Sequence, residues 1–142
     1  MLMNPSKVGL FGFGFMGKTH AMNVKNNPDA KLTAVFSIES DRPAIEQLGV
    51  TFYDDWHEMM GAEEFDVVII ATPTFTHAEI GLAAINKGYD VFMEKPMERT
   101  VDMCQMLIDA GEKRQVLLGM GHVLRFDDEY IAIKEKINSG VI

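Results

Sequence analysis

Strand-like and helix-like segments alternate along the whole chain, with short turns between them. The expected strands are 7–11, 32–37, 50–53, 66–72, 90–94 and 116–120. The expected helices are 15–26, 41–48, 55–60, 74–87, 100–114 and 127–138. Such alternation is typical of repeated βαβ units, whose right-handed crossovers build a parallel sheet with helices on both faces. Residues 1–142 are therefore expected to form an α/β fold, a doubly wound and mostly parallel sheet of about six strands.

Charge and apolar runs limit the partners of such a chain. Acidic residues outnumber basic ones by 21 to 13, so the formal net charge is −8, which argues against nucleic acid or an anionic membrane as a partner. The longest apolar run, 67–71, is far shorter than the roughly 20 residues of a membrane-spanning helix. Segment 1–6 lacks the features of a signal peptide. We expect a cytoplasmic protein that binds neither nucleic acid nor membrane.

The chain has a single cysteine, Cys104, which excludes an internal disulfide and a multi-cysteine metal site. Val101, Leu107 and Ile108 surround it at helical spacing. A small residue that faces the core is expected in such a stretch rather than a nucleophile. No metal site is predicted.

A glycine-rich turn, G-F-G-F-M-G, lies directly after the first expected strand and opens the first helix. Its first glycine allows a tight turn, its second lets a pyrophosphate approach the backbone, and its third lets the helix pack close to the strand. The free N–H groups at the start of the helix then face the phosphates. This context predicts a dinucleotide site, and a glycine turn that binds nothing is the alternative. The predicted site residues are Gly12, Phe13, Gly14, Phe15, Met16 and Gly17.

The end of the second strand decides which nicotinamide cofactor fits. An acid that holds the adenosine ribose is expected about 20 residues after the glycine turn, and Ser37 occupies that place. A hydroxyl does not repel a 2′-phosphate and Arg42 can pair with one, so these two residues favour NADP. With a slightly different turn, Glu39 would hold the ribose of NAD instead. A solvated polar loop without a ligand is the third possibility.

The fourth expected strand runs into A-T-P-T-F-T-H, residues 71–77. Ligands of open parallel sheets bind outside the carboxyl ends of the strands, so this turn is a candidate part of the cofactor site. Pro73 stiffens the turn, and the Thr74 hydroxyl is expected to cap the following helix. His77 lies in the first turn of that helix, near the crevice, and a packing or capping role is the alternative for it.

An acid and a lysine follow the apolar fifth strand. Lys95, at the rim of the sheet, is placed to donate or accept a proton. Glu94 is placed to orient the lysine or to hydrogen-bond the nicotinamide ribose. An exposed ion pair at the end of a strand is the alternative for these two residues.

The segments occur in an order that resembles a known family. G-x-G-x-x-G-x-x-H (12–20), A-T-P-T-x-x-H (71–77), E-K-P (94–96) and G-H-V-L-R-F (121–126) follow one another along the chain. Together they are similar to the cofactor-binding half of the glucose–fructose oxidoreductase/inositol dehydrogenase family, Gfo/Idh/MocA. The resemblance covers residues 7–142, and E-K-P after A-T-P is specific for this family.

The resemblance implies an NAD(P)-dependent oxidoreductase with a Rossmann fold that moves a hydride between nicotinamide and a hydroxyl carbon of a sugar or polyol. It assigns Lys95 to the catalytic lysine and places Arg125 where the two domains of the family meet. Ser37 stands where many members carry the ribose-binding acid, which leaves both NAD and NADP open. The cofactor pocket that it implies includes Thr72, Pro73, His77 and Glu94.

Family members continue into a second, α+β domain, which carries the substrate pocket and an Asp and a His that share proton transfer with the lysine. We therefore expect residues 1–142 to be the N-terminal, dinucleotide-binding part of a longer enzyme that forms homo-oligomers. By itself the chain is expected to bind cofactor, to catalyse nothing, and to expose apolar surface at 122–126 and along its last helix. The rival functions are a redox-sensing module that binds the dinucleotide without catalysis and a methyltransferase, and neither needs a lysine at the rim of strand five.

Overall fold

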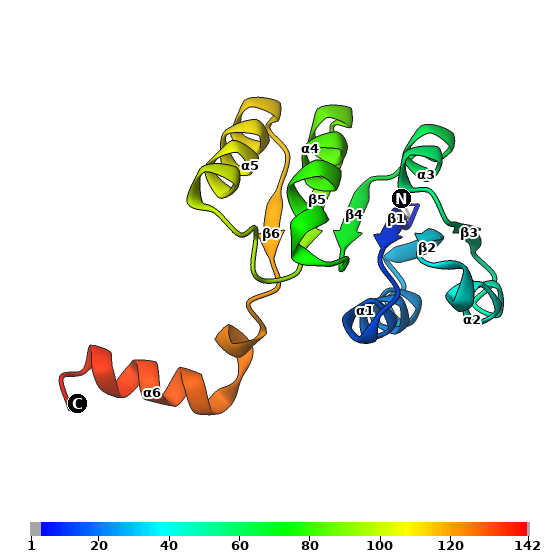
Figure 1. Cartoon of the computed structure of the whole chain (residues 1–142). Coiled ribbons are helices and arrows are strands. Elements are labelled where there is room, and N and C mark those ends of the chain that lie inside the picture. Colours follow the sequence, from blue (N-terminus) through cyan, green and yellow to red (C-terminus); the bar gives the residue numbers. More distant parts are fainter. Residues whose placement is uncertain (1–3, 142) are drawn as a thin grey trace.

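The computed structural model describes residues 4–141 and contains a six-stranded, all-parallel sheet with helices on both faces (Figure 1). The segment for which no signal peptide is predicted lies partly outside these residues. The strands are β1 (Ser6–Phe11), β2 (Ala30–Phe36), β3 (Thr51–Tyr53), β4 (Val67–Ile70), β5 (Asp90–Met93) and β6 (Leu118–Met120). The helices are α1 (Phe15–Asn26), α2 (Arg42–Glu46), α3 (Trp56–Ala62), α4 (His77–Lys87), α5 (Val101–Arg114) and α6 (Asp128–Asn138). Three 3-10 segments precede α2, α4 and α6, namely η1 (Glu39–Asp41), η2 (Thr74–Thr76) and η3 (Val123–Phe126).

The strand order is β3-β2-β1-β4-β5-β6, which confirms the predicted doubly wound sheet. From β1 the chain winds outward to β3, crosses back to β4 beside β1, and winds outward again to β6. Helices α1 and α2 cover one face of the sheet, and α3, α4 and α5 cover the other (Figure 1). The order therefore reverses between β1 and β4, and ligands of this fold class bind at the carboxyl ends of the strands at such a point.

Two apolar clusters, one on each face, hold the helices to the sheet. The strand β4 contributes to both clusters, since Val68 and Ile70 belong to one and Ile69 to the other. Helices on both faces explain why this strand is apolar at every position. The central strands are thus fixed from both sides, which gives the turns at their ends a rigid base.

The apolar stretch around Cys104 is less buried than the sequence suggests. Leu107 is fully buried, Cys104 is half-buried, and Val101 is 82% exposed. Helix α5 packs against α4 at one side of the sheet, so only a narrow stripe of it is covered. Cys104 therefore lies at the edge of this stripe, partly covered rather than fully in the core.

Helix α6 extends away from the sheet (Figure 1). None of its residues is buried by the described part of the chain. Apolar side chains on η3 and α6 are exposed as predicted, and they include Leu124, Phe126, Tyr130, Ile131, Ile133 and Ile137. Within residues 4–141, no helix combines the length and the apolar character needed to cross a membrane.

Candidate cofactor and active site

The carboxyl ends of five strands lie level with one another. The last residues of these strands are partners in the sheet, in the order Phe36, Phe11, Ile70, Met93 and Met120. The residue after each of them therefore starts a turn at the same rim, and these residues are Ser37, Gly12, Ala71, Glu94 and Gly121. Every segment that the sequence singles out begins there, so the fold brings them together.

The three glycines of the first turn have different structural roles. Gly12 has φ +98°, and a Cβ there would lie 2.5 Å from the carbonyl oxygen of Ala71. A Cβ on Gly17 would overlap the carbonyl oxygen of Gly12. Within the described structure, a Cβ on Gly14 would meet no atom within 4 Å. The fold thus needs Gly12 and Gly17, whereas Gly14 leaves open space, as a ligand lying against the backbone requires.

Helix α1 begins at this turn with Gly14 at the N-cap position. Among the described residues, no side chain caps this end and no acid lies in the first turn. Its first N–H groups are therefore available, and the positive end of the helix dipole favours an anion there. This donor set fits the pyrophosphate of a dinucleotide.

The other side chains of the turn differ in exposure. Phe13 is buried in the core, so only its backbone can contact a ligand. Met16 is half-buried, and Phe15 is 86% exposed. Phe15 is therefore the aromatic side chain of this turn that a bound molecule can touch.

The end of β2 is not the neutral site that the sequence predicts. Ser37 is buried, and its hydroxyl donates a hydrogen bond to the Asp41 carboxylate, with 2.6 Å between Oγ and Oδ2. Asp41 occupies the N-cap position of α2, but in the described structure its side chain makes no cap hydrogen bond. Its carboxylate turns back to the strand end instead. A negative charge therefore lies one hydrogen bond away from Ser37.

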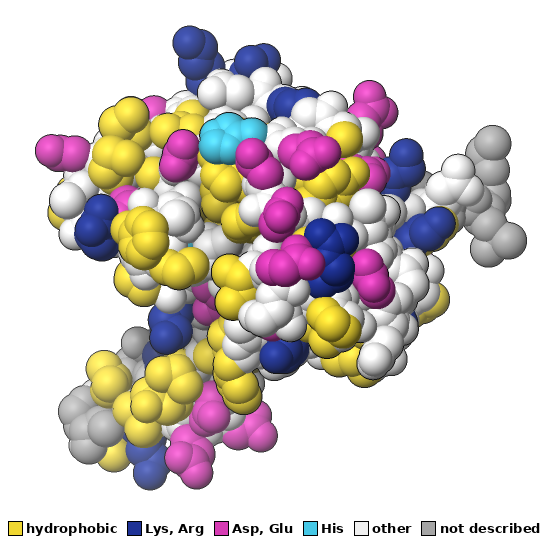
Figure 2. Space-filling model, turned by 45° about the vertical axis from the view of Figure 1, so that its right-hand side comes forward, with side chains coloured by type: hydrophobic (Ala, Val, Ile, Leu, Met, Phe, Trp, Pro, Cys, Tyr) yellow, Lys and Arg dark blue, Asp and Glu magenta, His cyan; other side chains and the backbone are white. Residues whose placement is uncertain are grey.

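Arg42 is also different from the free cation that was expected. Its Nε and Nη2 donate to the two carboxylate oxygens of Glu39 at 2.7 and 3.0 Å, and its guanidinium lies 4.3 Å from the ring centroid of Phe52. The hydrogen bond to Glu39 raises the pKa of Arg42, and the same bond lowers the pKa of Glu39. Figure 2 brings this end of the molecule forward and shows many acidic side chains over it. The charge of Arg42 is already paired.

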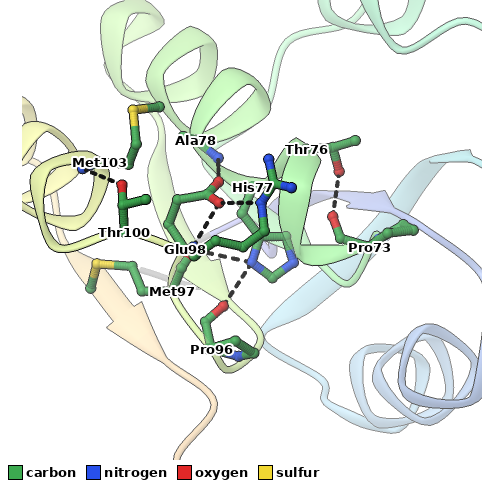
Figure 3. Close-up of polar contacts among 10 residues, drawn as sticks. Pro73, Thr76, His77, Ala78, Pro96, Met97, Glu98, Thr100 and Met103 are labelled. Carbon is green, nitrogen blue, oxygen red and sulfur yellow. Dashed lines mark hydrogen bonds and ion pairs between the residues drawn. The ribbon is translucent and has the colours of Figure 1, made fainter.

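His77 joins two turns of the rim from inside the protein. It is 1% exposed. Its Nε2 lies 2.9 Å from the carbonyl oxygen of Thr72, after β4. Its Nδ1 lies 3.1 Å from that of Pro96, after β5 (Figure 3). The packing alternative therefore describes its place in the structure.

The threonines around His77 do not cap α4 through their side chains. Thr74 begins η2, and neither its hydroxyl nor that of Thr76 makes a cap hydrogen bond within residues 4–141. The Thr76 hydroxyl lies 2.7 Å from the Thr72 hydroxyl and 2.8 Å from the Pro73 carbonyl oxygen. The predicted Thr74 cap is wrong, because the tight η2 turn places Thr76 rather than Thr74 before the helix.

Glu94 is buried at the rim and pairs with a residue of α1. Its Oε1 lies 2.8 Å from Nε2 of His20, and its Oε2 accepts the backbone N–H of Lys95 at 3.2 Å. The His20 ring packs edge-on against Phe92. A Cβ on Gly121 would lie 3.0 Å from the carboxyl group, so this glycine makes room for it. The acid thus ties α1 to the E-K-P turn and forms no exposed ion pair with the lysine.

Lys95 is exposed at the same rim. Together with Pro96 and residues 121–125 it lines a hollow of about 500 Å³. Arg125, on η3, lines this hollow as well. A lysine and an arginine therefore share one hollow beside the rim. In the part of the chain that the structure describes, no group of three or more His, Cys, Asp or Glu is placed to hold a metal ion.

Three residues that shape this site had no such role in the sequence-based prediction. His20 and Gly121 stand inside two of the characteristic segments, and their position there was the available signal. Asp41 lies four residues after Ser37 and accepts its hydrogen bond. His20 and Gly121 meet Glu94 from separate segments of the chain, which local spacing does not reveal.

Known proteins are similar to this chain over nearly all of its length. The model of an oxidoreductase family with an NAD-binding Rossmann fold, Gfo/Idh/MocA, matches residues 6–122. The myo-inositol 2-dehydrogenase of Thermotoga maritima is 33% identical over 139 residues, which cover 96% of this chain and 42% of that protein. The inositol 2-dehydrogenase of Salmonella typhimurium is 31% identical and is covered to the same extent.

Solved structures agree in fold. The scyllo-inositol dehydrogenase of Lactobacillus casei, crystallised with NAD(H) and scyllo-inositol, has a TM-score of 0.88 and 28% sequence identity. The match covers 98% of this chain and 42% of that one. The chain therefore spans about two fifths of the length of these relatives. With the matched family model and the rim geometry together, the chain belongs to the Gfo/Idh/MocA family of oxidoreductases.

Proposed function

We propose that the protein containing this chain is an NAD-dependent oxidoreductase that moves a hydride between nicotinamide and the hydroxyl-bearing carbon of a polyol or sugar. The observation that carries the proposal is the rim, where the open Gly14 turn and the hollow beside Lys95 lie at the ends of strands in register. The inositol dehydrogenases among the relatives support a polyol as the substrate class.

Each part of the cofactor has residues that suit it. The pyrophosphate would lie against the backbone of Gly14 and the first N–H groups of α1. The nicotinamide would lie near the turns that start at Thr72 and Lys95. Buried Glu94 and His77 would support these turns from below rather than touch the cofactor, since their polar atoms already face protein partners.

The reaction requires one proton transfer, to this chain in oxidation and from it in reduction. Bound NAD supplies the hydride acceptor. When an alcohol is oxidised, its C–H bond breaks with the electron pair, its O–H proton leaves, and a carbonyl forms. Neutral Lys95 would accept this proton at Nζ, and its protonated form would return it when the carbonyl is reduced. General acid–base catalysis of this kind contributes about 10²–10⁴ in rate.

The cofactor that we propose is NAD rather than NADP. The preference for NADP rested on a neutral Ser37 and an unpaired Arg42, and the carboxylates of Asp41 and Glu39 change both premises. Two like charges about 4 Å apart near a protein surface repel by about 4 kcal/mol before screening by salt. A 2′-phosphate at Ser37 would meet this repulsion from Asp41. The 2′-hydroxyl of NAD would instead find acceptors there.

The chain covers about two fifths of its relatives, and several features of the whole protein are part of the proposal. We propose that the chain is the N-terminal domain of a two-domain cytoplasmic enzyme that forms homo-oligomers. The substrate would then contact the second domain for the most part. Residues 1–142 would bind cofactor without turnover, because orienting the substrate contributes about 7–11 kcal/mol and half a site supplies little of it.

Protection of Lys95 from acylation tests the placement of the nicotinamide. The chain is treated with acetic anhydride with and without saturating NADH, and labelling of each lysine is read by peptide mass spectrometry. We expect NADH to slow labelling of Lys95 and to leave Lys113, exposed on α5, unchanged. Equal labelling of Lys95 with and without bound NADH would contradict its place beside the cofactor.

A further inference from the structure

The segment that follows Lys95 folds back onto the start of α4 (Figure 3). The buried His77 ring faces three backbone carbonyl oxygens, those of Thr72, Pro96 and Met97, at 2.9–3.2 Å. A neutral imidazole carries only one N–H. A neutral ring can donate to the turn after β4 or to the turn after β5, but not to both at once.

Glu98 supplies a second link between α4 and the loop after β5. Its side chain is 5% exposed. One carboxylate oxygen accepts the backbone N–H of Ala78 at 3.3 Å, and the other accepts that of Arg99 at 2.7 Å. Figure 3 shows the side chain reaching from the loop to the first turn of α4. The contact spans 20 residues of sequence.

The Ala78 N–H belongs to the first turn of α4, whose N–H groups have no partner inside the helix. The local threonines do not cap this end through their side chains in the described structure, so the carboxylate of Glu98 takes that place from outside. A negative charge also suits the positive end of the helix dipole. Burial by itself raises the pKa of Glu98, but the N–H groups of Arg99 and Ala78 and the Arg99 charge together lower it, which keeps the group ionised.

We infer that Glu98 is a positioning residue for the nicotinamide end of the site. It acts through Ala78 and through the backbone of 96–98, and so sets the distance between the Thr72 turn and Lys95. Within residues 4–141, the polar contacts of Glu98 are with Ala78 and Arg99 and reach neither the glycine turn nor the end of β2, where the rest of the dinucleotide would bind. The inference rests on the proposed function, because it assumes that nicotinamide lies between these two turns.

Comparing two ligands separates this role from a general effect on folding. ADP-ribose contains the adenine, the pyrophosphate and both riboses of NAD but no nicotinamide. Calorimetry gives the Kd of NADH and of ADP-ribose for wild type, Glu98→Ala and a control, Glu79→Ala. Glu79 also lies in the first turn of α4, but its side chain is 64% exposed. Urea unfolding of each variant is measured in parallel, and Glu98→Gln, which keeps the side-chain volume, replaces Glu98→Ala if the latter does not fold.

We expect Glu98→Ala to weaken NADH binding by about tenfold, or about 1.4 kcal/mol, and to change the Kd of ADP-ribose by less than about twofold. Glu79→Ala should leave the Kd of both ligands unchanged. Equal weakening of both ligands, or no weakening of NADH, would overturn the positioning role of Glu98. If wild type bound ADP-ribose but not NADH, the nicotinamide pocket itself would be refuted. If it bound neither, the proposed function would fail together with this inference.

Discussion

A single methyl group added at Gly17 should destabilise the fold far more than the same group added at Gly14. At Gly17 the new Cβ would overlap the Gly12 carbonyl oxygen and lie 2.8 Å from its carbon. Both atoms are backbone, so the strain cannot be relieved by a rotamer change. Overpacking costs about 1–3 kcal/mol, and we expect Gly17→Ala to lower the free energy of unfolding by about 3 kcal/mol, the upper end of that range.

At Gly14 the new Cβ meets no atom within 4 Å in the described structure, and the backbone is extended, with φ −67°. Alanine restricts the unfolded chain, which favours folding by about 0.4–1 kcal/mol, but it is a poorer N-cap residue than glycine. These effects oppose each other, so Gly14→Ala should change the free energy of unfolding by less than about 1 kcal/mol. Urea unfolding followed by circular dichroism measures both values. The different roles of the two glycines would be refuted if Gly17→Ala were as stable as wild type, or if Gly14→Ala lost as much as Gly17→Ala.

Three further predictions concern the rim. Gly121→Ala should displace the Glu94 carboxyl group, whose atoms lie 3.0 Å from the new Cβ, and should lower the free energy of unfolding by about 1 kcal/mol. Because Glu94 contacts the His20 ring, an unchanged NMR signal of that ring would contradict the displacement. Asp41→Asn should raise the affinity for NADPH relative to that for NADH by about tenfold, as measured by nicotinamide fluorescence. The same ratio of the two affinities in variant and wild type would show that Asp41 does not discriminate between the cofactors. The pKa of Glu98 in the folded protein lies below its ordinary value of 4.5. The free energy of unfolding of wild type should therefore exceed that of Glu98→Gln by its full amount above about pH 5, and this difference should vanish as pH falls through the folded pKa. A difference that does not change with pH would contradict this.

Much of the fold could be predicted because it depends on local patterns. The helix predicted over 15–26 has the same bounds in the structure, since a glycine turn starts it and Asn27-Pro28 follows it. The fully apolar run at 67–70 indicates a strand covered on both faces, and β4 is such a strand. Strands in register then place the turns at one rim, so the general position of the site follows from the order of elements.

The details of the site depend on contacts that spacing does not encode. Ser37 is polar by itself, but its hydrogen bond to Asp41 gives the strand end a negative charge. The partner of Glu94 is His20, 74 residues earlier in the chain. Local rules also favour Thr74 as the cap of α4, yet the carboxylate that reaches this helix comes from Glu98. The contacts of Glu94 and Glu98 were decided by tertiary packing, whereas that of Ser37 depends on the direction that the nearby Asp41 side chain takes.

Cofactor binding at the glycine turn is the central claim, and titration of the chain with NADH tests it most directly. Calorimetry compares wild type with Gly14→Val, whose branched side chain would fill the open space at Gly14. The account predicts that wild type binds NADH and that the folded variant binds it at least about a hundredfold more weakly, a loss of about 2.7 kcal/mol. Unchanged affinity in a Gly14→Val variant that unfolds in urea like wild type would contradict the claim.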